Sequence, residues 1–317
     1  MRIAVIGSGG VGGYIGGRLA QAGHEVAFLA RGAHLEALRS KGLRVKSTDG
    51  DFEIASVTAT DQPLELGPAD LFLFTVKTYD TEAVAASLKP LLRPGATVLT
   101  LQNGIDNHEI IDRALGDGVA LAGTIRIETS IAEPGVISHP SKGAITRFGE
   151  IGPDRTTGSQ SERVETLRAA FAEAKLNVAV PDDMRAELWD KFLFIVPFAG
   201  LTTLTRAPIG EILASPELTA TLLQMLAEAG AVAKAEGVDF GADVAEKRLG
   251  WMRRLHPDMK SSLQRDLERG KPLEIDALAG ALARLGAKHG IPTPVTSCVN
   301  AVLALEDRRA RAAATVA

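Results

Sequence analysis

The sequence predicts an α/β domain built on a parallel sheet, followed by an all-helical domain. The chain opens with an apolar run that ends in a glycine-rich turn and the start of a helix, MRIAVIGSGGVGGYIGG. Apolar runs such as DLFLFTV and ATVLTL then alternate with helical segments, as buried parallel strands do. From residue 182 onward only helical periodicity remains. We therefore expect one domain over residues 1–181 and a second over residues 182–317.

Composition excludes several classes of function. The chain has 317 residues, which is long enough for two domains, and its net charge is -4. No Lys/Arg-rich run indicates a nucleic acid or a membrane as a partner. The histidines show no metal-ligand spacing, so no metal site is predicted. The single cysteine, Cys298, rules out an internal disulfide and fits a cytoplasmic location, and no unbroken apolar stretch reaches about 18 residues.

The first strand is followed by glycines in the G-x-G-x-x-G spacing, which is typical of a Rossmann-type dinucleotide-binding unit. Gly7 allows the tight turn, Gly9 lets the backbone approach a pyrophosphate, and Gly12 lets the helix pack closely on the sheet. The alternative is a merely glycine-rich turn, but the strand before it and the helix after it favour a cofactor site. The predicted cofactor-binding turn comprises Gly7, Ser8, Gly9, Gly10, Val11 and Gly12.

The second strand, residues 24–30, is directly followed by Arg31. NAD-binding units commonly have an acidic residue there, which accepts hydrogen bonds from the ribose. A guanidinium can instead pair with a 2′-phosphate through two hydrogen bonds. Arg31 therefore predicts NADP rather than NAD, although a surface arginine is the simpler alternative.

The remaining strands of the first domain predict a small excursion and an extended sheet. Residues 43–59 alternate around an Asp49–Gly50 hairpin signal. We expect residues 119–131, 135–139 and 144–151 to extend the sheet in antiparallel fashion. A polar loop over residues 153–161, a helix over 162–174 and a strand over 177–180 complete the domain.

Two polar residues directly follow buried strands. Lys77 follows DLFLFTV, and Asn103 follows ATVLTL after one glutamine. In an open α/β sheet the carboxyl ends of the strands form the ligand crevice. The pair is therefore a candidate binding site, although each residue alone is compatible with an ordinary loop.

The second domain contains an unusual lysine. Lys191 lies inside the apolar run AELWDKFLFIVPFAGL, where a charge is costly to bury without a partner or a task. Helical spacing places Ile195 and Ala199 on the same face, and Pro197 should kink or break the helix. We expect Glu274 and Asp276 in the first turn of a helix over residues 273–289, where the helix dipole alone favours acidic residues.

These motifs together resemble the ketopantoate reductase (2-dehydropantoate 2-reductase) family over nearly the whole chain. The matching elements, in order, are GSGGVGGYIGG, LAR-G, TVK, LQNG, W-x-K, S-S-x-x-Q-x-D and G-x-P-x-E-I-D. The resemblance implies an NADP-binding Rossmann domain followed by an all-α domain like the C-terminal domain of 6-phosphogluconate dehydrogenase. It also implies an NADPH-dependent oxidoreductase that reduces a 2-keto acid to a 2-hydroxy acid, with ketopantoate as the first candidate, in pantothenate biosynthesis.

The resemblance assigns roles residue by residue. Arg31 would bind the 2′-phosphate, and Lys77 and Asn103 would lie along the cofactor and near the substrate. Lys191 would be the general acid that protonates the carbonyl oxygen. Glu274 would support that lysine and the ribose or substrate hydroxyls, and Ser262 would bind the substrate carboxylate.

The sequence departs from the family at the substrate. Family members that reduce ketopantoate have asparagines at three positions that are apolar here, namely Ile195, Ala199 and Met259. One alternative is therefore an oxidoreductase of the same fold with a more apolar carbonyl or hydroxyacid substrate. Another is a non-catalytic NADP sensor, which the retention of Lys191 and Glu274 argues against. A small carbonyl compound is the expected partner, and a homodimer is left open.

Overall fold

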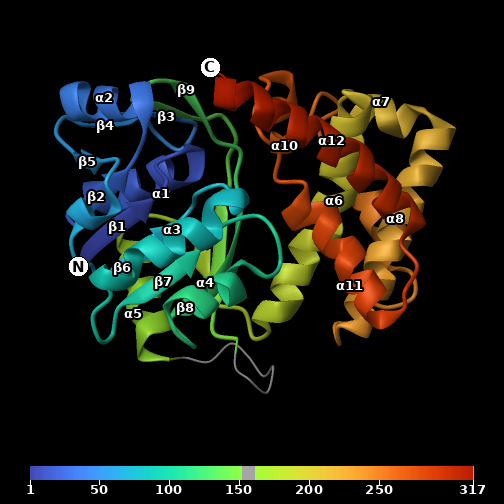
Figure 1. Ribbon diagram of the computed structural model, residues 1–317, viewed down its shortest axis with the longest axis horizontal. Helices are drawn as coiled ribbons and strands as arrows, with labels where there is room; N and C mark the ends of the chain where they lie inside the picture. Colours follow the sequence, from blue (N-terminus) through green and yellow to red (C-terminus); the bar gives the residue numbers. More distant parts are fainter. Residues whose placement is uncertain (152–160, 317) are drawn as a thin grey trace. The chain divides into compact units, whose positions relative to one another are not determined.

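The computed structural model describes residues 1–151 and 161–316 and divides into two compact units (Figure 1). Unit 1 comprises Met1–Gln102 and Asp106–Glu187, and unit 2 comprises Asn103–Ile105 and Leu188–Ala317. The predicted fold class is confirmed, because unit 1 is an α/β unit and unit 2 is helical. The domain boundary after residue 181 stays a prediction. The predicted polar loop over 153–161 lies outside the described residues, apart from Ser161.

Unit 1 is built on an eight-stranded sheet with the order β12-β11-β8-β7-β6-β1-β2-β5. All neighbouring strands pair in parallel except β8 and β11. The strands are β1 (Arg2–Ile6), β2 (Glu25–Leu29), β5 (Thr58–Thr60), β6 (Leu71–Phe74), β7 (Thr97–Thr100), β8 (Ala120–Arg126), β11 (Ile145–Gly149) and β12 (Val178–Ala179).

The strand order places a topological switch point beside β1. The chain leaves β1 through a helix to β2 on one side, and later returns to β6 on the other side. Helices that leave neighbouring strands in opposite directions open a crevice at the carboxyl ends of those strands. In this chain the crevice lies where β1 and β6 end, which is the position of the glycine-rich turn.

A second sheet corrects one prediction. Residues 135–139 do not extend the main sheet; they form β10 (Val136–His139) in a four-stranded sheet of order β4-β3-β10-β9. Its other strands are β3 (Leu43–Ser47), β4 (Phe52–Ile54) and β9 (Ser130–Glu133). β10 pairs in parallel with β3, and β8 pairs in parallel with β7, so the expected antiparallel extension is right only for β8 with β11. The alternation of apolar and polar residues identifies these segments as strands but does not determine which strands they pair with.

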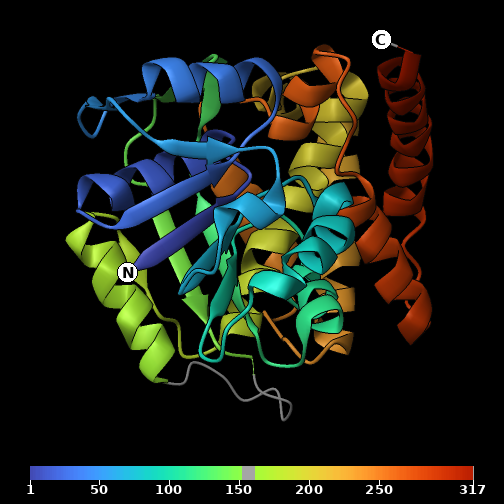
Figure 2. The same ribbon diagram turned by 60° about the vertical axis from the view of Figure 1, so that its left-hand side comes forward.

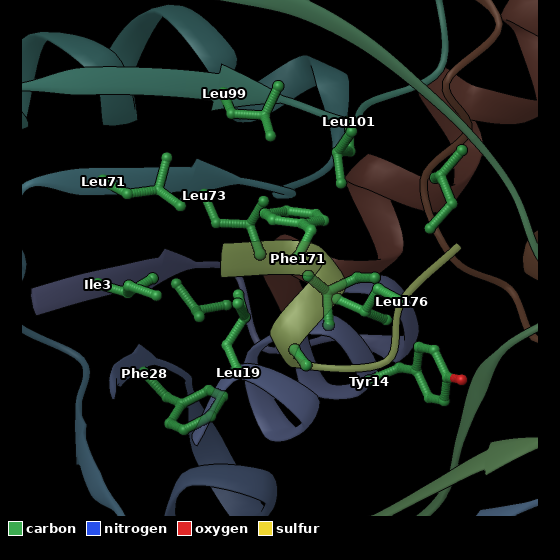
Figure 3. Packing of buried hydrophobic residues seen from close by; sticks show 14 of the residues in the cluster. Ile3, Tyr14, Leu19, Phe28, Leu71, Leu73, Leu99, Leu101, Phe171 and Leu176 are labelled. Atoms are coloured by element: carbon green, nitrogen blue, oxygen red, sulfur yellow. The ribbon is translucent and has the colours of Figure 1, made fainter. Parts of the chain in front are cut away.

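Helices cover both faces of the main sheet because its strands are apolar on both sides. Ile3 and Val5 contribute to one buried cluster with residues of α1 (Gly10–Gln21), α2 (Gly32–Lys41) and α5 (Glu162–Glu173). Ala4 and Ile6 contribute to the other, with α3 (Thr81–Leu88) and α4 (Asn107–Leu115). Figure 3 shows Phe171 of α5 among leucines of the sheet. Short 3₁₀ helices complete the unit: η1 (Pro63–Leu66), η2 (Thr78–Asp80) and η3 (Lys89–Leu91).

Unit 2 is a helical bundle in which α8 packs against α7, α9, α11 and α12. Figure 2 shows α12 as one long helix, in dark red. Its beginning is fixed by buried Glu228 of α8, whose carboxylate accepts hydrogen bonds from the backbone N–H groups of Val295 and Thr296. The helices are α6 (Met184–Thr205), α7 (Ile209–Ala214), α8 (Pro216–Ala235), α9 (Val244–Met252), α10 (Ser262–Glu268), the π-helical turn η4 (Asp276–Gly280), α11 (Ala281–His289) and α12 (Pro294–Val316).

The long helix α6 is the most apolar of the bundle and runs unbroken through Pro197. Among the described residues it is the one helix that is long and apolar enough to cross a membrane by length and composition. However, 67% of its apolar window is buried inside the molecule, as expected of a core helix. Its length and composition are therefore weak evidence for a membrane span.

The packing of α5 on the sheet generates a stability prediction. Phe171 is fully buried and packs edge-on against Phe148 at 5.4 Å between ring centroids. We expect Phe171→Ala to lower the free energy of unfolding by about 3–5 kcal/mol, because it leaves a cavity between helix and sheet. Urea denaturation followed by circular dichroism measures this. Leu64→Ala is the control, since Leu64 is 60% exposed and its loss should change stability by less than about 0.5 kcal/mol. Equal effects of the two variants would contradict the proposed packing.

Candidate functional site

The turn after β1 leaves no room for side chains at Gly7 and Gly12. Gly7 has a φ of +100°, and a Cβ there would lie 2.8 Å from the backbone nitrogen of Val76. A Cβ on Gly12 would lie 2.2 Å from the carbonyl oxygen of Gly7 and 2.5 Å from Oγ1 of Thr75. Both contacts are far inside van der Waals distance, so bare backbone is required for α1 to leave β1 so closely.

The neighbouring glycines differ in what surrounds them. A Cβ on Gly9 would meet nothing within 4 Å, so this stretch of backbone is open to a ligand. A Cβ on Gly10 would lie 2.8 Å from the backbone of Thr129 and 2.9 Å from that of Ser130. Gly10 is therefore needed for packing against the segment that leads into β9, a requirement that the motif alone does not reveal.

Side chains of neighbouring strands hold the turn in place. The hydroxyl and the backbone N–H of Ser8 both donate to the carbonyl oxygen of Leu29 at the end of β2, at 3.1 and 3.0 Å. The hydroxyl of Thr75 donates to the carbonyl oxygen of Gly7 at 2.7 Å. Both donors of Ser8 are thus committed to the protein, and Ser8 joins the turn to β2.

The first turn of α1 fits an anionic group. Its N-cap is Gly9, which offers no side chain to the helix, and no acidic residue lies in the first turn. The first N–H groups of an α-helix, here those of Gly10, Val11 and Gly12, have no intrahelical acceptor, and the helix dipole makes this end positive. Together with the open space at Gly9, these donors suit the pyrophosphate of a dinucleotide.

Three further predicted residues follow the ends of strands. Arg31 is the N-cap of α2, and its Nη1 lies 3.8 Å from Oδ2 of Asp80. Lys77 precedes the 3₁₀ turn η2 after β6. Asn103 follows Gln102 at the end of β7 and is grouped with unit 2, whereas Arg31 and Lys77 belong to unit 1. The structure thus brings Arg31, Lys77 and the glycine turn to one edge of the main sheet.

Gln102 is a positioning residue that the sequence reasoning missed. Its buried side-chain amide donates to the carbonyl oxygen of Val76 at 2.9 Å and to the hydroxyl of Thr81 at 2.8 Å. Its Oε1 accepts from the hydroxyl of Thr100 at 2.9 Å. Gln102 therefore ties the end of β7 to the loop that contains Lys77. The position of Gln102 between a buried strand and Asn103 is the one feature of the sequence that points to this role.

His34 links the second sheet to the region of the glycine turn. The backbone N–H of Gly135, in the turn between β9 and β10, donates to Nδ1 of His34 at 3.1 Å. Burial lowers the pKa of the His34 imidazole below its usual value, and the nearby backbone of Ser8 offsets part of that shift. The ring is therefore mainly neutral at pH 7. Histidine in these surroundings is structural, and the described residues contain no cluster suited to a metal ion.

In unit 2, Lys191 lies on a mostly apolar face of α6. The lysine is only 9% exposed, and it has an interaction partner, as required for an ammonium group in such surroundings. Positions four and eight residues further on, Ile195 and Ala199, share this side of the helix. Phe198, seven residues on, lies on the same face, so a substrate held at Lys191 on this helix would face hydrocarbon.

Helix α9 borders this face with an aromatic side chain and an ion pair. Trp251 packs edge-on against Phe194 at 4.8 Å between centroids, and Phe194 stacks on Phe198 at 5.1 Å. One turn earlier on both helices, the guanidinium of Arg248 pairs with the carboxylate of Asp190. Trp251 is nevertheless 40% exposed, which is high for so large an aromatic residue.

Ser262 is the first residue of α10 and is exposed. Its neighbour Ser261, which sequence reasoning did not single out, is the N-cap of this helix and is buried. Ser261 accepts a hydrogen bond from Thr202 of α6 at 2.8 Å and one from the backbone N–H of Gln264 at 3.0 Å. Ser261 therefore attaches the beginning of α10 to α6 and sets the position of Ser262.

The position of Glu274 corrects another prediction. Glu274 does not lie in a first helical turn; it precedes η4, which begins at Asp276. Pro272 has no N–H, and the N–H of Leu273 donates to the carboxylate of Asp307 on α12 at 2.7 Å. The segment is thus tied to α12 in a non-helical conformation. Glu274 is 7% exposed and, like Lys191, has an interaction partner.

Comparisons with known proteins agree with these two units. The family model described as "Ketopantoate reductase PanE/ApbA" matches residues 3–152, and its C-terminal counterpart matches residues 183–306. The chain is 33% identical to an uncharacterized oxidoreductase, YkpB, of Bacillus subtilis, over 96% of this chain and 98% of that protein. It is 32% identical to a 2-dehydropantoate 2-reductase of Mesorhizobium japonicum, over 98% of each chain. The crystal structure of a PanE/ApbA family ketopantoate reductase from Ralstonia eutropha superposes on this chain with a TM-score of 0.88. The two sequences are 33% identical, and the match covers 98% of this chain and 100% of that one.

The different surroundings of Gly9 and Gly12 give a paired prediction. We expect Gly9→Ala to fold with wild-type thermal stability, because its φ of -67° suits alanine and the methyl group meets only open space. The same methyl group should weaken binding of a nicotinamide dinucleotide by about tenfold or more, equivalent to ~1.4 kcal/mol, because it would occupy the space in which we expect the pyrophosphate. Gly12→Ala should instead lower the free energy of unfolding by about 1–3 kcal/mol through overpacking. Fluorescence titration and thermal melts measure these effects. Wild-type affinity for the dinucleotide in Gly9→Ala would place the ligand elsewhere.

Proposed function

The chain belongs to the ketopantoate reductase family, and from this premise we propose that it reduces the carbonyl group of a 2-oxo acid with hydride from NADPH. The observation that carries this proposal is the mostly buried Lys191, an amine with a proton to give on a mostly apolar helix face. A sensor that only binds NADP needs no such group. The family is one of oxidoreductases, and the glycine turn suits a nicotinamide dinucleotide.

The cofactor when bound supplies the hydride, and the chain supplies binding, orientation and charge. The turn from Gly7 to Gly12 would hold the pyrophosphate on the first N–H groups of α1. Arg31 would pair with the 2′-phosphate, which supports NADPH over NADH. Lys77 and Asn103, each following a strand end, would contact the cofactor and the substrate.

Lys191 has the role of general acid in this proposal. Hydride addition to a carbonyl carbon builds negative charge on the oxygen, so a cation that can donate a proton there lowers the barrier. Apolar surroundings strengthen this attraction because little water screens it. Glu274, another mostly buried charged residue of unit 2, would hold the lysine and the ribose or substrate hydroxyls. Ser262 would donate a hydrogen bond to the carboxylate of the substrate.

Two candidate substrates, both 2-oxo acids, differ in the side group attached to the carbonyl carbon. 2-Dehydropantoate is the first candidate, because relatives about 30% identical to this chain are named 2-dehydropantoate 2-reductases. A 2-oxo acid with a larger apolar group is the second, and it is favoured by Ile195 and Ala199 and by the neighbouring Phe194, Phe198 and Trp251. The side chains of Ile195, Ala199, Phe194 and Phe198 offer contact area but no hydrogen bond, and Trp251 adds a single indole N–H donor. The first candidate implies a place in pantothenate biosynthesis, and we propose a cytoplasmic location for either.

Replacing the general acid tests the proposal. We expect Lys191→Met to lower kcat for a 2-oxo acid by about 10²–10⁴-fold, because the variant keeps the length of the side chain and loses its proton. NADPH affinity should stay at the wild-type value. Stopped-flow absorbance at the NADPH band gives kcat, and fluorescence titration gives the dissociation constant. Lys288→Met, which removes an exposed lysine of unit 2 that pairs with Glu236, is the control. Wild-type turnover in Lys191→Met would exclude the role of Lys191. Tight NADPH binding by the wild type without turnover of any carbonyl compound would favour the sensor.

The choice between the substrates can be tested at Ile195. We expect Ile195→Asn to raise kcat/KM for 2-dehydropantoate by about tenfold, because an amide there can bond the substrate hydroxyl. It should lower kcat/KM for 2-oxo acids with apolar groups. Ile195→Leu is the matched control, since it preserves both volume and polarity. A wild-type enzyme that prefers 2-dehydropantoate to every apolar 2-oxo acid in the panel would remove the second candidate.

A further inference from the structure

We infer that Asp80 is a cofactor-specificity residue, which weakens the preference for NADPH that Arg31 provides. The inference rests on the proposed function, because it assumes that Arg31 meets the 2′ position of the adenosine. Its structural basis is the pair between Nη1 of Arg31 and Oδ2 of Asp80, 3.8 Å apart within unit 1. The two residues come from different sides of the switch point, after β2 and after β6.

The carboxylate of Asp80 does not cap the helix that begins at this residue. Asp80 is the N-cap of α3, and aspartate is among the preferred N-cap residues because its oxygen accepts a backbone N–H of the first turn. No such capping bond is made by its side chain. The carboxylate lies beside the guanidinium of Arg31 instead, and both side chains remain accessible, at 37% and 69% exposure. A ligand that reaches Arg31 therefore also meets Asp80.

A 2′-phosphate and a 2′-hydroxyl experience this pair differently. A phosphate monoester has a charge of about −1.5 to −2 at pH 7, so it is attracted by Arg31 and repelled by Asp80. The 2′-hydroxyl of NADH has no charge and can donate a hydrogen bond to a carboxylate, the interaction that acidic residues provide in NAD-binding units. Arg31 alone favours NADPH strongly, whereas Arg31 with Asp80 favours NADPH less.

Nucleotide fragments test this without any substrate. The variants are Asp80→Asn, which keeps the shape and a side chain that caps helices well, and Glu82→Gln as the matched control. Glu82 lies in the first turn of the same helix and is exposed, so the control removes one negative charge close by. Calorimetry measures binding of 2′,5′-ADP, which has the 2′-phosphate, and of 5′-AMP, which lacks it.

We expect Asp80→Asn to tighten 2′,5′-ADP by about three- to tenfold at low salt, the effect of one unit charge a few ångströms away in water, and by less at high salt. It should leave 5′-AMP binding unchanged or weaker, and it should raise the ratio of NADPH to NADH affinity. Glu82→Gln should change 2′,5′-ADP binding by a smaller factor. Equal effects of the two variants, or equal tightening of both nucleotides by Asp80→Asn, would overturn the inference. Absent turnover of 2-oxo acids with this nucleotide pattern intact would contradict the proposed reaction and leave the role of Asp80 standing.

Discussion

The close approach of α1 to the end of β1 is the constraint on which the cofactor half of the molecule depends. A single methyl group on Gly12 would lie 2.2 Å from the carbonyl oxygen of Gly7. Because the helix starts this close to the strand, its first N–H groups stand directly at the switch point between β1 and β6. The sheet order would create the crevice without these glycines, but a helix displaced by side chains would not present its N-terminus there.

The backbone around this crevice is fixed before any ligand arrives. Hydrogen bonds of Ser8 join the turn to β2, and those of Thr75 join it to the end of β6. The side chain of Gln102 joins the end of β7 to the loop that follows β6. Each bond links a different pair of chain segments, so the donors at the start of α1 have little freedom to reorganise. A site that is already ordered loses less conformational entropy on binding, which favours affinity. The side chains that contribute most to such a site are therefore ones that need not touch the ligand.

The sequence predicts the parts of this structure that local patterns determine. The strands β1, β2, β6 and β7 are short apolar runs, and the glycine spacing gives the turn, so these could be predicted, whereas β5 joins the main sheet from a segment predicted as a separate excursion. The pairing of β3 with β10 could not, because these strands are about ninety residues apart and their pairing depends on tertiary packing. Helical periodicity of its neighbours predicts a helix at Glu274, yet Pro272 and the bond from Leu273 to Asp307 hold the chain in a non-helical conformation there. The roles proposed for Lys191, Glu274 and Ser262 follow from the family resemblance and stay predictions.

The two units encode specificity in different chemical terms. In unit 1 the space proposed for the pyrophosphate is bounded by backbone, so steric demands at Gly7 and Gly12 restrict the sequence strongly. In unit 2 the proposed substrate would meet side chains on α6, where Ile195 is only partly buried, so packing restricts this position less than it restricts Gly12. At two of the positions where the family resemblance implies an amide, α6 has the apolar residues Ile195 and Ala199. Under the proposed function a change of substrate therefore requires no change of fold, and the paired rings of Phe194 and Trp251 would offer the substrate mainly contact area.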